Sequence, residues 1–340
     1  TTGSYNQASG RLTLYNNTTG SYNIASGFAS LYSNTTGDYN VASGYQALLS
    51  NTTGSYNVAS GYAALGGATN TGDYNVASGY KALYANTTGS NNTASGNSAL
   101  SSNTTGTFNA AFGAAALRDN TTGSYNTAVG VNTLLKTTTG SGNTALGYDS
   151  LDQNTTGDYN TGFGMHSLGS ATTAVNNTAL GYQTMTSTTT GSNNTAVGRD
   201  ALYYNTTGYS NTAIGSSALS FNTTGYSNSS VGFFALNSNT TGAGNTATGD
   251  QALRYNTTGS SNTAFGNGAG HSNQTGSGNI FLGFNAGYSE TGSNKLYIDN
   301  SSTASPLIYG DFATNALTIN GTLTATGGIG TTDIYHTNGT

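Results

Sequence analysis

Hydrophobic residues return along this chain at a long and nearly constant interval. One leucine stands at a fixed place in each unit, 17 residues after the last apart from one step of 18, and the series runs from Leu14 to Leu253 with Met185 as its one replacement. The polar triplet Thr-Thr-Gly keeps the same interval, and the place of its glycine marks seventeen units from Gly3 to Gly276. Such an interval predicts a repeat protein built from stacked supersecondary units.

Each unit reads approximately Asn-Thr-Thr-Gly-Ser-Tyr-Asn-Thr-Ala-Val-Gly-Tyr-x-Ala-Leu-x-x. A unit this short, with two glycines and much asparagine and threonine, cannot form a helix pair, whereas one or two short strands with turns fit. We therefore predict an all-β fold, a parallel β-solenoid with one 17-residue unit per turn. Stacking the turns about 4.8 Å apart gives a rod of roughly 80 Å.

Two positions are filled alike in every unit. An asparagine follows the marker glycine by three residues, and a second glycine follows that asparagine by four. Asparagine amides can hydrogen-bond from turn to turn as side-chain ladders, and the second glycine suits a corner with positive φ or a close approach of two backbones. We assign a structural role to both columns, which include Asn6, Asn23, Asn40, Asn57, Asn126 and Asn194 with Gly10, Gly27, Gly44 and Gly130.

The predicted strand Asn-x-Ala-x-Gly has small residues on one face and usually one apolar residue on the other. The apolar residue precedes the alanine early in the chain, as in Val41, and follows it later, as in Leu146. A strand with small or apolar side chains on both faces is usually covered on both. We predict that neighbouring copies of the chain cover the second face; the alternative is a monomeric solenoid that encloses every column.

Composition narrows the classes of function. Only 6% of the 340 residues are charged, the formal net charge is −5 and no basic run occurs, which excludes the electrostatic footprint of a nucleic-acid-binding protein. No apolar stretch is long enough to be a membrane-spanning helix. The 50 glycines and the scarcity of bulky side chains argue against the thick core of an ordinary globular enzyme.

Catalytic and metal-binding patterns are absent from the sequence. His166, His271 and His336 lie far apart without carboxylates at ligand spacing, so we expect them to be solvent-facing substitutions. No paired carboxylates and no phosphate-binding loop occur, and we predict no catalytic residue, metal or cofactor. The many Asn-Thr-Thr triplets, such as those at Asn34 and Asn103, match the glycosylation sequon but follow from the repeat itself.

Aromatic and threonine columns are the candidates for surface binding. The tyrosines are Tyr22, Tyr39, Tyr56 and Tyr74 after the marker glycine, and Tyr45, Tyr62 and Tyr80 after the second glycine. Exposed aromatic columns suit glycan stacking or multivalent contact; the alternative is cross-turn stacking that stabilises the rod. The paired threonines suggest ice binding as an alternative function. Such a function would require a flat face with two threonine columns.

The recurrent Asn-Thr-Ala-Val-Gly of residues 126–130 and 194–198 resembles the short repeat motif of trimeric autotransporter adhesin heads. It is one residue shorter, and the period of 17 also departs from that family's repeat. The resemblance covers residues 1 to about 291. It implies a homotrimeric, left-handed parallel β-roll in which three chains bury apolar columns against one another.

Beyond Gly292 the repeat gives way to short strand-like runs. We divide the chain into a solenoid at 1–291 and a connector at 292–340, where Asn320-Gly321 between alternating residues predicts a β-hairpin. Residues 294–300 and 306–310 resemble the connector before the endosialidase-type intramolecular chaperone of phage tail fibres and bacterial fibre proteins. That resemblance implies a precursor from which a chaperone was removed.

These features predict a non-enzymatic structural and adhesive fibre segment, the shaft or head of a trimeric adhesin or tail fibre. We expect it outside the cell, on a cell surface or in a virion fibre. We expect the chain to associate with itself as a homotrimer and to attach to a cell-surface glycan or receptor through multivalent contact. We expect it neither to bind nucleic acid nor to insert into a membrane. The alternative is a monomeric β-solenoid that binds ice or glycan.

Overall fold

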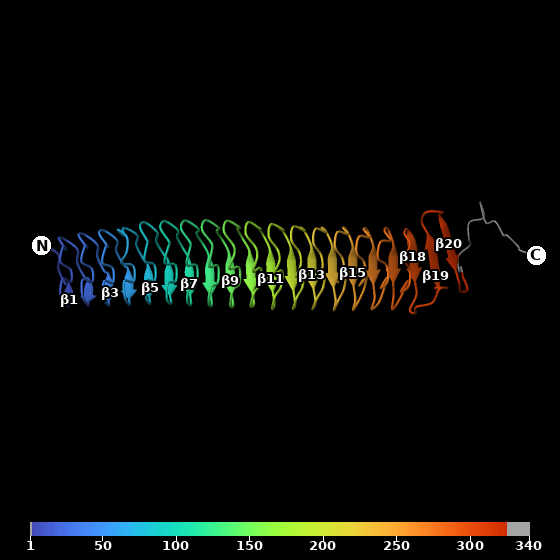
Figure 1. The fold of residues 1–340 in the computed structure, drawn as a ribbon, viewed down its shortest axis with the longest axis horizontal. Coiled ribbons are helices and arrows are strands. Elements are labelled where there is room, and N and C mark those ends of the chain that lie inside the picture. The colour runs from blue at the N-terminus through green and yellow to red at the C-terminus, as the bar shows by residue number, and fades with distance from the viewer. Residues whose placement is uncertain (1, 325–340) are drawn as a thin grey trace, which may run out of the picture.

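The computed structural model describes residues 2–324, which form a long rod of stacked turns (Figure 1). All regular structure in this range is β-strand, and no helix occurs in it. Each turn of the repeat contributes one strand of three residues, and these strands run parallel in one sheet along the rod. The prediction of an all-β fold, a parallel β-solenoid, is confirmed.

The strands of the repeat share one place in each unit. They are β1 (Gln7–Ser9), β2 (Ile24–Ser26), β3 (Val41–Ser43), β4 (Val58–Ser60), β5 (Val76–Ser78), β6 (Thr93–Ser95), β7 (Ala110–Phe112), β8 (Thr127–Val129), β9 (Thr144–Leu146), β10 (Thr161–Phe163), β11 (Thr178–Leu180), β12 (Thr195–Val197), β13 (Thr212–Ile214), β14 (Ser229–Val231), β15 (Thr246–Thr248), β16 (Thr263–Phe265) and β17 (Ile280–Leu282).

Consecutive turns are paired in the register of the sequence repeat. Gln7 lies beside Ile24, and Ile24 beside Val41. Outside the strands, backbone hydrogen bonds also join one turn to the next, as from Leu31 N to the carbonyl oxygen of Ala47 at 3.0 Å. Equivalent residues therefore form columns parallel to the axis of the rod.

A single chain fills its own interior. In one turn the strand residue Ala42, the adjacent pair Ala47 and Leu48, and the asparagines Asn40 and Asn51 are all fully buried or nearly so. The leucine and alanine columns thus close a narrow core without a second copy. The expectation of an oligomer consequently depends only on the side chains that point outward.

The corners of the turns require a left-handed backbone at residues other than glycine. Tyr39, Gln46 and Leu48 have φ values of 56°, 56° and 51°, and the same three places are left-handed in most turns. This conformation costs an L-residue roughly 1–2 kcal/mol. The surrounding burial and the hydrogen bonds between turns must hold these strained corners.

The second glycine of each unit combines positive φ with a close backbone approach. The φ values are 120° at Gly27 and 131° at Gly44. A Cβ atom added to either residue would lie 2.5 Å from the carbonyl oxygen of the corresponding glycine in the next turn. The two reasons expected for this glycine column, a positive φ and a close approach of two backbones, are therefore both present.

The asparagine that follows the marker glycine joins its turn to the backbone of the next one. Asn23 Oδ1 accepts a hydrogen bond from the backbone N of Asn40 at 2.9 Å, and Asn23 Nδ2 donates to the carbonyl oxygen of Gly37 at 2.9 Å. The amide–amide contacts expected from the sequence are secondary in this column. Each buried amide instead satisfies one donor and one acceptor of the neighbouring turn.

A second asparagine column, which our sequence reasoning missed, forms the true amide ladder. It consists of the first residue of Asn-Thr-Thr: Asn34 Nδ2 donates to Asn17 Oδ1 at 2.8 Å and to the carbonyl oxygen of Gly37 at 3.0 Å. Thr137, Ala171 and Thr188 interrupt the column. Within residues 2–324, the buried hydroxyls of the two threonines have no hydrogen-bond partner. The regular recurrence of Asn-Thr-Thr was the signal for this ladder.

The parallel ladder continues into the segment after the repeat. Strand β18 (Lys295–Ile298) pairs parallel with β17, and β19 (Ile308–Asp311) and β20 (Ala316–Ile319) then add antiparallel pairings. Asn320 and Gly321 follow β20, and residues 322–324 belong to no strand. The hairpin predicted about Asn320-Gly321 is not shown, because the residues after 324 lie outside the described range.

We expect Gly44→Ala to lower the free energy of unfolding by at least about 2 kcal/mol, because strain and overlap with the neighbouring carbonyl act together. Gly244→Ala is the matched control: its φ is 66°, but an added Cβ would come no closer than 3.8 Å to Ser261 Oγ. The control should lose about 1 kcal/mol. Urea denaturation followed by circular dichroism measures both, and equal losses would contradict the overlap argument.

Asn126→Ala should destabilise the rod by about 2–6 kcal/mol, because two buried backbone groups lose their partners. These groups are the N–H of Asn143, which donates to Asn126 Oδ1 at 2.9 Å, and the Gly140 carbonyl, which accepts from Asn126 Nδ2 at 2.8 Å. Exposed Asn97 is the control, and Asn97→Ala should change stability by less than about 0.5 kcal/mol. A similar effect of both substitutions in denaturant titrations would refute the role of the column.

Candidate functional site

The outward face of the sheet, here called the strand face, carries four columns of side chains. Exposed residues alternate with more buried ones from Tyr22 through Ile24 and Ser26 to Phe28. The same alternation in the next turns brings together two aromatic columns, one aliphatic column and one serine column. The candidate binding tyrosines of the sequence analysis all lie on this face.

The tyrosines of the strand face are stacked on one another. Tyr22, Tyr39, Tyr56 and Tyr74 follow each other with ring centroids 4.9 Å apart, and the column through Tyr45, Tyr62 and Tyr80 has spacings of 5.1 and 5.3 Å. Each inner ring thus has a neighbouring ring over both faces, and no sugar ring fits between them. These tyrosines offer their edges and hydroxyls to a ligand, while their faces stabilise the stack.

Stacking also affects the ionisation of one ring. The pKa of Tyr39 is raised, first by desolvation and then by the neighbouring hydroxyls of Tyr22 and Tyr56. The column through Tyr39 is interrupted at Asn91 and resumes with Phe108 and Tyr125, and later turns have Gly142 or Asn176; all of these residues are left-handed. Asparagine and glycine adopt this conformation at lower cost than tyrosine.

Apolar side chains are exposed on the strand face of most turns, but they occupy two neighbouring columns. The early ones, such as Ile24 and Val58, are 45% and 40% exposed and stand first in their strands. Later ones, such as Phe163 at 48% and Phe265 at 58%, stand third. In the later turns threonines such as Thr161 occupy the neighbouring column. The strand face therefore presents one threonine column beside an apolar one, and only Thr246 and Thr248 place two threonines in one strand.

The paired threonines of Asn-Thr-Thr are used differently. The hydroxyl of Thr35 donates to the carbonyl oxygen of Thr52 at 3.0 Å, whereas the adjacent Thr36 is exposed. Since the first hydroxyl of such a pair belongs to the turn-to-turn bonding, only the second remains for contact with water or a ligand. Asn34 and Asn103, which begin two of these sequons, are fully buried and could not accept a glycan in the folded rod.

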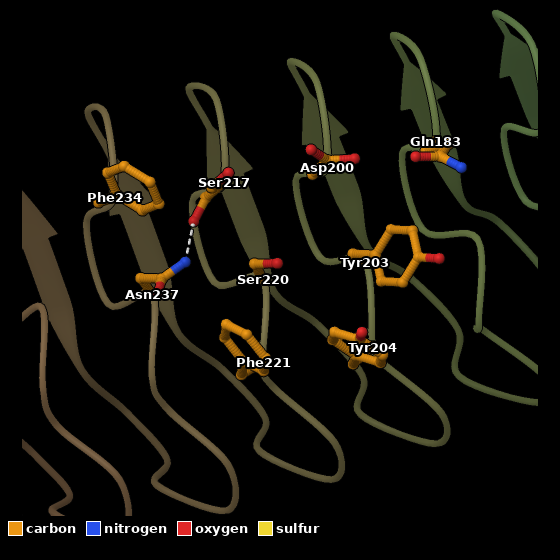
Figure 2. Close-up of a pocket in the computed structure, with 9 residues that line it drawn as sticks. All are labelled: Gln183, Asp200, Tyr203, Tyr204, Ser217, Ser220, Phe221, Phe234 and Asn237. Carbon is orange, nitrogen blue, oxygen red and sulfur yellow. Dashed lines mark hydrogen bonds between the residues drawn. The ribbon is translucent and has the colours of Figure 1, made fainter.

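A hollow of about 350 Å³ lies between the second glycine and the next Asn-Thr-Thr in the later turns (Figure 2). Its floor is formed by Ser217 and Ser220, which are 7% and 6% exposed. Tyr203 lies at one end, one turn before the serines, and Phe234 with Asn237 lies at the other, one turn after them. The hollow forms because two small residues of one turn, Ser217 and Ser220, lie between larger residues of the turns before and after.

Further side chains complete the border of this hollow. Gln183 and Asp200 continue the column of Ser217 and Phe234 (Figure 2). Tyr204 and Phe221, stacked with centroids 5.2 Å apart, border both this hollow and an adjoining one of about 490 Å³. The sequence analysis did not identify this site, because it depends on which residue types meet across turns in otherwise variable columns.

His271 differs from our expectation of solvent-facing histidines, whereas His166 is partly exposed. His271 is only 7% exposed and is stacked on Tyr288 at 4.3 Å, and its pKa is lowered by desolvation and by Arg254. His166 Nδ1 lies 3.9 Å from Asp149 Oδ2, one turn earlier. His336 lies outside the described residues. Residues 2–324 contain no cluster of three potential metal-binding side chains.

Comparison of the chain with protein-family models, with curated proteins and with solved structures gives no match. In the described part of the chain, no helix is long and apolar enough to cross a membrane.

Tyr56→Asn should change the free energy of unfolding by less than about 1 kcal/mol, because relief of left-handed strain offsets the loss of stacking. Tyr56→Val should cost more than about 2 kcal/mol, since a β-branched residue at φ 59° is severely strained. Thermal unfolding followed by circular dichroism distinguishes the two variants. A large loss for the asparagine variant would mean that the stack contributes more than its geometry indicates.

Proposed function

We propose that this chain is a structural and adhesive extracellular fibre segment, the shaft or head of a trimeric adhesin or tail fibre. The observation that carries the proposal is the row of exposed apolar side chains on the strand face, which recurs in most turns and shifts from the first to the third strand position between the early and the late turns. A monomer in water rarely leaves so long an apolar surface uncovered. Two further copies of the same chain would cover it along its whole length.

The rod also has the form that a fibre segment needs. Every turn is bonded to the next by buried amides and backbone hydrogen bonds, so the axis resists bending and extension. Each repeat contacts only its neighbours, and length can be gained by adding turns. Three parallel copies would present identical surfaces to a cell and so bind it through avidity rather than through one strong site.

The ice-binding alternative receives less support from the same surface. The strand face has a single threonine column over most turns, next to Phe163 or Leu180 and not next to a second threonine. The first threonine of Asn-Thr-Thr is engaged within the rod. A fibre that attaches to a cell-surface glycan or receptor would also give a role to the exposed apolar and aromatic side chains of the strand face.

We expect the chain to sediment in solution at about 103 kDa, three copies of 34.2 kDa. Phe163→Asp together with Leu180→Asp, which places charges in the apolar column, should shift the mass toward one copy. Thr156→Asp, at an exposed threonine of Asn-Thr-Thr, should leave the mass unchanged. Sedimentation equilibrium measures all three proteins, and a monomeric wild type would overturn the trimer.

A further inference from the structure

We propose that the hollow between Tyr203 and Phe234 binds one neutral hexopyranose residue of a glycan. This assignment goes beyond the fibre function, because it places recognition in a defined site instead of in repeated surface contact. It does not depend on the oligomeric state. The argument rests on hydrogen-bonding groups that the protein leaves unused, on the aromatic border and on the balance of charge.

The nearly buried floor offers hydrogen-bonding groups without protein partners. Within residues 2–324, the hydroxyls of Ser217 and Ser220 make no hydrogen bond to another side chain or to the backbone. Asn237 is 7% exposed; its Nδ2 donates to the Ser217 carbonyl oxygen at 2.9 Å, while its Oδ1 accepts nothing from the described residues. These residues line the hollow, where their unused groups remain accessible and can hydrogen-bond to a polar ligand or to water.

The remaining border suits a ring with several hydroxyls. Asp200 contributes one carboxylate oxygen that no described group contacts, and Gln183 contributes an amide with both a donor and an acceptor. Tyr203 and Phe234 lie at opposite ends of the hollow, two turns apart, which is about 10 Å along the axis. Aromatic ends with a few convergent polar groups, in a hollow of about 350 Å³, are typical of a small-molecule site.

Two structural contacts hold the aromatic ends in place. The Arg254 guanidinium lies over the ring of Phe234, 4.7 Å from its centroid. Tyr203 packs edge-on against Tyr204 with centroids 4.6 Å apart. The ends of the hollow are thereby fixed before a ligand arrives, which lowers the entropic cost of binding.

Charge and polarity exclude the other classes of small ligand. Asp200 Oδ2 lies 3.0 Å from Arg199 Nε, so the carboxylate already has a cationic partner and a second cation would gain less from it. An anion would meet the free oxygen of Asp200. An apolar ligand would leave the serine hydroxyls and the Asn237 oxygen desolvated without a partner.

The location within the repeat also distinguishes this hollow from the tyrosine stacks. On the strand face the inner rings are covered by their neighbours at 4.9 Å. In the columns of the hollow, an aromatic residue, a serine and a larger residue follow one another in consecutive turns as Tyr203, Ser220 and Asn237. A space for a sugar ring is therefore present here, whereas the stacks have none.

The test is saturation-transfer NMR with the wild-type chain and a mixture of the methyl glycosides of glucose, galactose, mannose and N-acetylglucosamine. We expect transfer to at least one glycoside, with a dissociation constant on the order of 1 mM for so small a ligand. Ser220→Trp should fill the hollow and reduce the transfer about tenfold or more. Ser102→Trp, a half-buried serine on an earlier turn, adds the same ring elsewhere and should leave the transfer unchanged.

Tyr203→Ala provides a second variant if the tryptophan variant fails to fold, which circular dichroism reveals. It removes one end of the hollow and should also reduce transfer about tenfold or more. The proposal is overturned if the wild type shows no transfer to any glycoside, or if transfer persists in these variants. Binding of tetramethylammonium in place of the glycosides would also overturn it. Sedimentation mass is measured separately, so failure of this site and failure of the trimer are distinguishable.

Discussion

The hydrogen bonds that join each turn to the next are the constraint on which the whole structure depends. Every turn must offer its neighbour the same donors and acceptors at the same places, or buried backbone groups are left unpaired. This requirement explains why the second glycine and the asparagine after the marker glycine recur in every unit. The positions of Ser220 and Tyr203, in contrast, differ in residue type from turn to turn. The sequence repeat is thus a consequence of satisfying the backbone between turns.

The small size of the turn has a conformational cost that burial offsets. A unit of 17 residues closes only by left-handed corners, and one of these corners falls on the buried leucine itself, as at Leu48. Leucine is a poor choice for this conformation, but its side chain supplies most of the apolar burial in the turn. At the exposed left-handed position, which is that of Tyr39, burial does not offset the cost. Asparagine, serine and glycine therefore share this position with tyrosine.

The parts of the fold that repeat could be predicted, because a period shows itself in the sequence. The solenoid, the strand position and the buried leucine column all follow from residues that recur every 17 positions. The left-handed leucines could not be predicted, since propensity assigns this conformation to glycine and asparagine. The buried position of His271 was also missed, because it depends on Tyr255 and Tyr288 in neighbouring turns.

The hollow illustrates why a functional site is difficult to find in a repeat sequence. A regular repeat produces flat columns, in which each side chain lies against a copy of itself and no cavity forms. A site with its own shape requires a local departure, such as the turn with Ser217 and Ser220 between turns that carry Tyr203 and Phe234. The columns that repeat one residue type in every turn are fixed by the bonding between turns. Recognition of a particular ligand must therefore depend on the columns whose residue type changes from turn to turn. In a protein of this architecture, the positions that break the pattern are therefore the better guide to specificity, and the positions that keep it are the guide to stability.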